Sequence, residues 1–280
     1  MSQIHWFPGH MKKAINNIEE KVKLCDVVIE ILDARAPYSS INRDLEIRIK
    51  NKKRLAVISK VDLADPSETK YWEAYLRTKF DALLILNLTD PKSTKVLSQE
   101  VAKLGVEKHE KEKAKGMKPQ PIKAMIIGVP NVGKSSLINR LANRKAAGVQ
   151  NKPGYTRGEQ FIKVNNDFIL LDTPGVLPMN YEDRQVATNL ALIGSMREDI
   201  LPNDELVKSL LYILRKNYPL SLKERYGIET IGEQEEVLKA VATRRGLLTC
   251  GELDISKAEI TLLKDFKDGK LGRISLDQHL

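Results

Sequence analysis

The expected fold follows largely from one segment, Lys123-Ala-Met-Ile-Ile-Gly-Val-Pro-Asn-Val-Gly-Lys-Ser-Ser-Leu-Ile-Asn-Arg-Leu141. Its octapeptide Gly128 to Ser135 matches the pattern G-x-x-x-x-G-K-[ST], with an apolar run before it and the start of an amphipathic helix after it. The pattern is typical of a loop that binds nucleotide phosphates. A chance glycine-rich turn is the alternative, and the flanking strand and helix patterns favour the phosphate loop.

Each part of such a loop has a chemical task. Glycines let backbone N–H groups approach the phosphates, the lysine neutralises β- and γ-phosphate oxygens, and the serine hydroxyl ligates magnesium. We therefore expect catalytic help from Lys134 and a magnesium ligand at Ser135. The nucleotide contacts expected from this stretch are Asn131, Val132, Gly133, Lys134, Ser135 and Ser136.

Working outward, short apolar runs at 26–32, 54–58, 82–86 and 123–127 are each followed by a turn signal and a helical pattern. This alternation predicts an α/β fold with a mainly parallel sheet and helices on both faces. The runs 161–164 and 168–171 predict a β-hairpin across Asn165-Asn-Asp167. Ligands in such sheets bind at the carboxyl ends of the strands.

The domain organisation follows from where these patterns stop. Residues 1–180 are predicted to form the sheet domain, with a charged, proline-ended solvated linker at 107–121; an RNA contact at that linker is the less favoured alternative. Apolar residues recur at helical spacing over 206–216 and 233–243. Residues 181–280 are therefore predicted to form a small all-helical domain.

Two further motifs follow the phosphate loop. In Asp172-Thr-Pro-Gly175, Asp172 can hold a magnesium-bound water and the Gly175 N–H can meet the γ-phosphate. In Pro153-Gly-Tyr-Thr-Arg157, Thr156 can close over magnesium and the γ-phosphate. Alone, Asp-Thr-Pro-Gly is a common tight turn, but three elements in this order indicate a nucleotide switch.

The base is predicted from a motif that lies upstream of the phosphate loop. Ser59-Lys-Val-Asp62 directly follows a strand, and a carboxylate at Asp62 can face the N1 and the exocyclic amine of guanine. The Lys60 stem would lie along the purine face, and Val61 completes the loop. Asn87, Leu88 and Thr89 occupy the place of the loop whose backbone reads the guanine O6. Ser59 stands where Asn is usual, and a hydroxyl cannot replace both contacts of an amide.

The bulk properties restrict the classes of partner and compartment. The net charge of +9 and pI near 9.3 favour an anionic partner, and residues 181–280 hold 15 Lys and Arg against 17 Asp and Glu, so the positive excess lies in the first 180 residues. Two lone cysteines and the lack of any long apolar run predict a cytoplasmic protein with no membrane partner. The basic residues expected to touch RNA are Lys12, Lys13, Lys50, Lys52, Lys53, Arg54, Arg215, Lys216, Arg244 and Arg245.

These motifs, in this order, resemble the circularly permuted GTPases, and most closely the ribosome biogenesis GTPase A (YlqF) family. The resemblance also rests on Trp6-Phe-Pro-Gly-His-Met11 and Asp33-Ala-Arg-Ala-Pro37 with Ser39 and Asn42. It implies a six-stranded, circularly permuted P-loop G domain, a helical RNA-binding domain, GTP hydrolysis to GDP with magnesium, and action on a precursor of the large ribosomal subunit, its RNA and proteins. We expect a monomer off the ribosome.

The permutation bears on catalysis. It places residues 5–11 beside the switch, and the position after Gly175, where many GTPases carry a water-orienting Gln, is Val176. We therefore expect His10 to position or activate the attacking water; a structural histidine packed with Trp6 and Phe7, or an RNA contact, is the alternative. Asn131 resembles the residue that holds potassium beside the phosphates in related GTPases, the alternative being loop stabilisation.

Three functions are compatible with these features. The leading one is a GTP-driven assembly factor that binds the subunit precursor in its GTP state, is stimulated by it, and leaves after hydrolysis. The others are a stand-alone nucleotide hydrolase and an RNA-binding module in which GTP is a structural ligand. Asp33 and Arg35 are expected to form a hydrogen-bonded loop rather than to contact RNA directly.

Overall fold

The structure is a computed structural model that describes residues 4–5, 18–88, 90–143, 161–166, 168–171, 180–181, 183–196 and 200–279. Several predicted functional residues lie outside these ranges: His10, Lys12, Lys13, Thr89, Thr156, Asp172, Gly175 and Val176.

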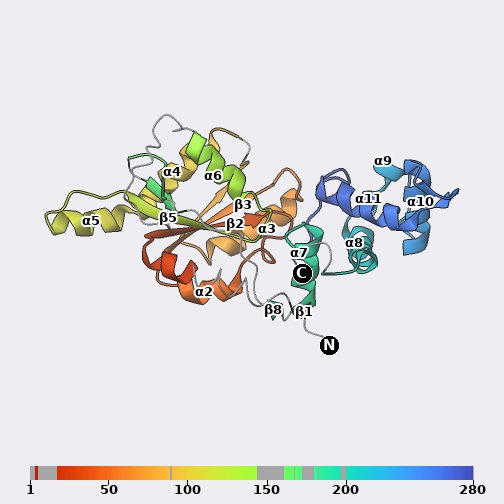
Figure 1. The fold of residues 1–280 in the computed structure, drawn as a ribbon, viewed down its shortest axis with the longest axis horizontal. Coiled ribbons are helices and arrows are strands. Elements are labelled where there is room, and N and C mark those ends of the chain that lie inside the picture. The colour runs from red at the N-terminus through yellow and green to blue at the C-terminus, as the bar shows by residue number, and fades with distance from the viewer. Residues whose placement is uncertain are drawn as a thin grey trace.

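A six-stranded sheet forms the centre of the first domain (Figure 1). Its order is β4 (Ala82–Ile85), β3 (Lys53–Ser59), β2 (Val27–Asp33), β5 (Ile122–Ile127), β7 (Phe168–Leu171) and β6 (Phe161–Lys163). All neighbouring pairs are parallel except the β6–β7 hairpin. The predicted α/β fold is confirmed, because each apolar run forms a strand, and the central strands β2 and β5 are almost wholly buried.

Alternation along β2 assigns the two faces of the sheet. Val27, Ile29 and Ile31 face one cluster, which holds apolar residues of α4 (Ser93–Leu104) and α6 (Lys134–Asn143). Val28 packs with α2 (Arg43–Ile49) and the helical residues 18–23 on the other face, and Leu32 packs with α3 (Pro66–Arg77). Helices therefore cover both faces, as the alternation of strand and helix patterns predicts.

The segment predicted as a solvated linker is solvated, but its first half is α5 (Val106–Ala114) rather than plain connector. None of the residues of α5 is buried. Ion pairs one turn apart, Lys111–Glu107 at 2.7 Å and Lys108–Glu112 at 3.3 Å, support the helix where no core does.

The C-terminal part of the chain, residues 183–196 and 200–279, is mainly helical, and we call it the second domain. It contains α7 (Arg184–Leu192), α8 (Asn203–Asn217), α9 (Lys223–Tyr226), α10 (Gln234–Arg245) and α11 (Ile255–Lys267). The expectation that it is all-helical was wrong at one hairpin, β9 (Leu248–Thr249) with β10 (Glu252–Leu253). Positive φ angles at Cys250 (53°) and Gly251 (86°) build its tight turn, and two-residue strands are too short to show alternation in a sequence.

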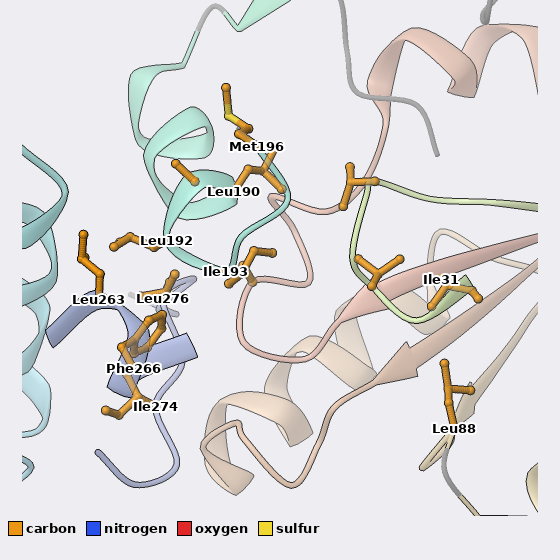
Figure 2. Packing of buried hydrophobic residues seen from close by; sticks show 14 of the residues in the cluster. Ile31, Leu88, Leu190, Leu192, Ile193, Met196, Leu263, Phe266, Ile274 and Leu276 are labelled. Atoms are coloured by element: carbon orange, nitrogen blue, oxygen red, sulfur yellow. The ribbon is translucent and has the colours of Figure 1, made fainter. Parts of the chain in front are cut away.

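The two domains share one continuous apolar cluster. Figure 2 shows members from both, from Ile31 and Leu88 of the sheet domain to Leu263 and Phe266 of α11. Polar contacts add to it, because the Leu276 N–H donates to the carbonyl of Arg35 at 2.6 Å. The end of the chain thus returns to the sheet domain.

The beginning of the chain also pairs with a distant segment. β1 (Ile4–His5) pairs antiparallel with β8 (Asn180–Tyr181), in which His5 lies opposite Asn180. No helix in the described ranges has the length and apolar composition that a bilayer crossing requires.

Candidate nucleotide-binding site

The predicted phosphate loop leaves the carboxyl end of β5, which lies between β2 and β7. Parallel strands place their carboxyl ends at one edge of a sheet. The same edge therefore holds Asp33 at the end of β2, Ser59 at the end of β3 and Leu86 just after β4. The motifs that the sequence spreads over more than 100 residues meet at this edge.

Two glycines of the phosphate loop are required by close packing. Gly128 has φ 148°, and a Cβ there would lie 2.6 Å from the carbonyl oxygen of Ile31. Gly133 has φ 104°, and a Cβ there would lie 2.8 Å from the Leu88 side chain. Side chains at either position would displace a neighbouring strand or loop, so the backbone can approach phosphates only with glycine here.

Lys134, at the first position of α6, is folded back over this loop. Its Nζ donates to the carbonyls of Gly128 at 2.9 Å and Val129 at 2.5 Å, and only 7% of the residue is exposed. Burial lowers the pKa of Lys134 to about 8. Within the described ranges it has no carboxylate partner, so a phosphate group would supply the negative charge that balances the ammonium. Ser135 and Ser136 are exposed in the first turn of α6, and Ser135 is thus open to a magnesium ion.

Ser59 connects the predicted base loop to the phosphate loop. Its hydroxyl lies 2.8 Å from the carbonyl oxygen of Val132 and 3.0 Å from that of Leu32, and the residue is 1% exposed. The hydroxyl therefore makes the contact to the phosphate loop. Because it is buried there, it does not also reach a base.

An ion pair to the end of β2 holds the next residue of the predicted base loop. Lys60 has an unusual positive φ of 57°, and its Nζ lies 3.0 Å from Oδ2 of Asp33. Burial alone would raise the pKa of Asp33, but the Arg35 guanidinium and the Lys60 ammonium hold that pKa below its usual value. Asp62 is exposed, as a carboxylate that reads a base must be.

The second predicted base loop packs on the first helix turn that follows it. The carbonyl of Asn87 accepts from Ser93 Oγ at 2.6 Å and from the Asp90 N–H at 2.9 Å. Leu88 is buried against Gly133. The phosphate loop therefore contacts both loops predicted to read the base.

Sequence reasoning missed the contacts that the second domain makes with the phosphate loop. Asn131 Nδ2 donates to the carbonyl of Gly194 at 2.6 Å, and Ser195 Oγ donates to the carbonyl of Pro130 at 2.8 Å. Both partners follow the end of α7. Neither Gly194 nor Ser195 belongs to a recognisable motif, so no signal in the sequence points to them.

Arg35 has the structural role predicted for it. Its guanidinium contacts Asp33 through two bonds, Nη2–Oδ2 at 2.9 Å and Nε–Oδ1 at 3.0 Å, and both side chains are buried. Nη1 also donates to the carbonyl of Lys267 at 3.1 Å, at the end of α11. The pair thus connects the end of β2 to the second domain.

Basic residues predicted to touch RNA fall into two groups. Arg54 lies 3.0 Å from buried Glu30 and stacks on Phe80, and Arg215 donates to the carbonyl of Ile231. Lys52 donates to the carbonyl of Cys25. The candidates that project from the surface are Lys50, Lys53, Lys216, Arg244 and Arg245.

The order of these parts defines a class of protein. A phosphate loop follows the central strand of a parallel sheet, while the strands that carry the predicted base loops precede it in the chain. This is a P-loop G domain with circularly permuted connectivity.

The comparisons with known proteins agree and narrow the class. Residues 123–242 match the family model described as 50S ribosome-binding GTPase. The chain is 41% identical to ribosome biogenesis GTPase A of Bacillus cereus over 98% of this chain and 93% of the relative, and 38% identical to that of Bacillus pumilus over 98% of both. The crystal structure of GNP-bound YlqF from T. maritima superposes with a TM-score of 0.68 at 26% identity, covering 95% of this chain and 98% of that one.

The chain belongs to the ribosome biogenesis GTPase A family and hydrolyses GTP. GTP and GDP are its nucleotides.

Proposed function

We propose that this GTPase is an assembly factor that binds a precursor of the large ribosomal subunit in its GTP state and leaves after hydrolysis. The observation that carries the proposal is the pair of contacts between the phosphate loop and the second domain, Asn131 to Gly194 and Ser195 to Pro130. In this proposal the phosphate loop binds the nucleotide, the second domain binds the ribosomal partner, and two hydrogen bonds join them. A change at the phosphates can therefore change the orientation of the domain.

The proposal assigns the phosphate, guanine and magnesium contacts to separate residues. Gly128 to Ser136 holds the phosphates, with Lys134 on their oxygens, and Asp62 reads guanine. Magnesium, bound by Ser135 and by Thr156 and Asp172 of the switch, would offset phosphate charge. The backbone N–H of Gly175 would meet the γ-phosphate.

His10 positions the attacking water in this proposal. The pairing of His5 with Asn180 supports this, because Asn180 follows Gly175 by only five residues. His10 follows His5 by the same number of residues. His10 and Gly175 are therefore each only five residues from the paired residues His5 and Asn180. Val176 offers no polar group for the water, and the histidine supplies one.

Asn131 supports a potassium ion beside the phosphates in this proposal. Its amide nitrogen is engaged by the Gly194 carbonyl, and the oxygen of an amide is the atom that ligates a cation. A bound potassium would add positive charge at the phosphates as bond cleavage proceeds.

Cosedimentation tests the function directly. Purified protein is mixed with mature and immature large subunits in the presence of a non-hydrolysable GTP analogue, GDP or no nucleotide, and turnover is measured in parallel. We expect pelleting with immature subunits in the analogue and loss of pelleting in GDP, with turnover raised by the subunits. Turnover that the subunits do not change, with no pelleting in any of the three nucleotide states, would favour a stand-alone hydrolase. Nucleotide-independent pelleting with negligible turnover would favour an RNA-binding module.

A double variant tests the proposed partner surface. Arg244 and Arg245 are exposed in the last turn of α10 and are far in sequence from every nucleotide motif. Replacing both with Glu should weaken pelleting most strongly at low salt, since each lost phosphate contact lowers the salt dependence of binding. Basal turnover without subunits should stay at the level of the unmodified chain.

A further inference from the structure

Residues 273–275, near the end of the chain, lie along the predicted base loop. Arg273 Nη2 donates to the carbonyl of Val61 at 2.7 Å, and Arg273 Nε donates to the carbonyl of Ala64 at 2.8 Å. The Ile274 N–H donates to the carbonyl of Leu63 at 3.0 Å.

A fourth bond closes this contact. The Asp65 N–H donates to Ser275 Oγ at 3.1 Å, at the point where α3 begins. Leu63 also packs closely on the second domain, because a Cβ at Gly269 would lie 2.5 Å from its Cδ2 atom. The backbone from Val61 to Asp65 is therefore lined on one side by residues 273–275, which we call the C-terminal strap.

The other end of the base loop is anchored to the same domain by a different route. The Lys60 ammonium pairs with Asp33, Asp33 pairs with Arg35, and Arg35 bonds to the carbonyl of Lys267. The N–H of Leu276 in turn donates to the carbonyl of Arg35. Exposed Asp62 thus lies between two anchors that both depend on the second domain.

We propose that Arg273 is a positioning residue for guanine recognition: through the carbonyls of Val61 and Ala64 it holds the loop in which Asp62 faces the base. The proposal rests on the base-reading role proposed for Asp62. Its physical reason is preorganisation. A surface loop that is free before binding must lose conformational entropy when its carboxylate engages the base, and an anchor in place beforehand removes part of that cost.

The two bonds have the character that such an anchor requires. A guanidinium presents several donors in a fixed planar arrangement, so one side chain can bridge two carbonyls three residues apart and set their spacing. An aliphatic side chain could not do this, and a lysine ammonium has no such fixed geometry. The nucleotide site is therefore completed by a residue that lies more than 200 positions downstream of the loop.

A thermodynamic consequence follows by linkage. If docking of the C-terminal strap strengthens the grip on guanine, then guanine nucleotide strengthens the docking of the strap by the same factor. A partner that draws the second domain away from the loop would weaken nucleotide binding.

Comparison of GDP with IDP tests the proposal in the full-length chain. IDP lacks the exocyclic amine that a carboxylate at position 62 would bind but keeps the N1–H, so the ratio of the two dissociation constants measures the contact between Asp62 and that amine. For Arg273→Ala we expect a GDP dissociation constant raised about 5- to 10-fold, a smaller rise for IDP, which offers Asp62 only its N1–H, and kcat at saturating GTP retained. Arg273→Lys should lie between the unmodified chain and Arg273→Ala. Lys239→Ala, which removes an exposed cation of α10 in the same domain, should match the unmodified chain.

The outcomes separate this proposal from the one on which it rests. Asp62→Ala should abolish the preference for GDP over IDP, and if it does not, the base-reading role of Asp62 is wrong. If Asp62→Ala abolishes the preference while Arg273→Ala leaves it intact, the base-reading role stands and the strap has no part in it. Equal losses for GDP and IDP in Arg273→Ala would also overturn the proposal, because they indicate general destabilisation. Should Arg273→Ala fail to fold, the GDP-to-IDP ratio of Arg273→Lys decides: an intermediate ratio supports the strap and an unchanged ratio overturns it.

Discussion

Raising the pH should weaken nucleotide binding through a single group, the ammonium of Lys134. Without nucleotide this group is 7% exposed and bonded only to two carbonyls of the phosphate loop, and burial lowers its pKa to about 8. The phosphates of a bound nucleotide bring negative charge to it, so its pKa must rise on binding. The bound state then holds more protons than the free state. By linkage, affinity is full below pH 8 and falls as pH rises above 8.

The size of the effect follows from the pKa of the free protein. With a pKa of about 8, roughly 90% of the protein carries the ammonium at pH 7 and roughly 10% at pH 9. If only the protonated form binds the phosphates well, the dissociation constant of GDP rises about tenfold between these two pH values, or about 1.4 kcal/mol. An ordinary lysine, with a pKa of about 10.4, would give almost no change over the same range.

Fluorescence titration with a labelled GDP at pH 7.0 to 9.0 and constant ionic strength measures this. Guanine itself begins to titrate at the upper end of that range, so Lys134→Arg serves as the matched control. Its guanidinium stays charged throughout, and it shares any titration of the base. We expect a steep rise for the unmodified chain and a shallow one for the control. Parallel curves for the two proteins would contradict this prediction, since they would show that Lys134 keeps its proton in the free loop.

Four more predictions follow from the site and the domain interface. His10→Ala should lower turnover by about 100-fold or more while GDP affinity stays nearly unchanged; equal single-turnover rates for variant and unmodified protein would remove His10 from catalysis. Turnover should be higher in potassium than in sodium, and Asn131→Ala should abolish the difference; equal rates in both salts would exclude the ion. Ser59→Ala removes the buried bond to Val132 and should raise the GDP dissociation constant about 5-fold, or about 1 kcal/mol; calorimetry that finds no change would show that the contact contributes nothing. The Asp277 carboxylate accepts from the Ser39 N–H, the Ser39 hydroxyl and the Asn189 amide, so Asp277→Asn turns an amide donor toward groups that already donate. This variant should lower the free energy of unfolding, measured in urea, by about 1 to 3 kcal/mol. An unchanged urea midpoint would contradict this account.

Local patterns were sufficient for the sheet and for most of the motifs. Strands buried on both faces must be nearly all apolar, and the stretch from Val27 to Asp33 shows this directly. The phosphate loop could be recognised because its chemistry requires glycines and a lysine at set spacing. The spacing of the base motif, upstream of the phosphate loop, revealed the permutation.

Charge and short elements misled the sequence reasoning. Residues 106–114 lack a buried face, and a helix that depends on ion pairs one turn apart leaves no apolar period to find. The hairpin around Cys250 and Gly251 is too short for alternation. Ser59 could be judged only as a departure from a motif, whereas its hydroxyl makes the contact with Val132.

Local stretches of the chain were enough to predict the fold class, the phosphate loop and the order of the nucleotide motifs, because each depends on residues that are close together in sequence. How the second domain meets the site emerged only from the folded chain. Gly194, Ser195 and Arg273 belong to no motif. Ser195 donates to the carbonyl of Pro130, and Arg273 donates to the carbonyls of Val61 and Ala64. Gly194 accepts a hydrogen bond through its own carbonyl. Every residue except proline offers the same carbonyl and N–H groups, and even proline keeps its carbonyl, so a contact with the backbone leaves no pattern in the partner sequence. Such contacts exist only once packing has brought the two segments together.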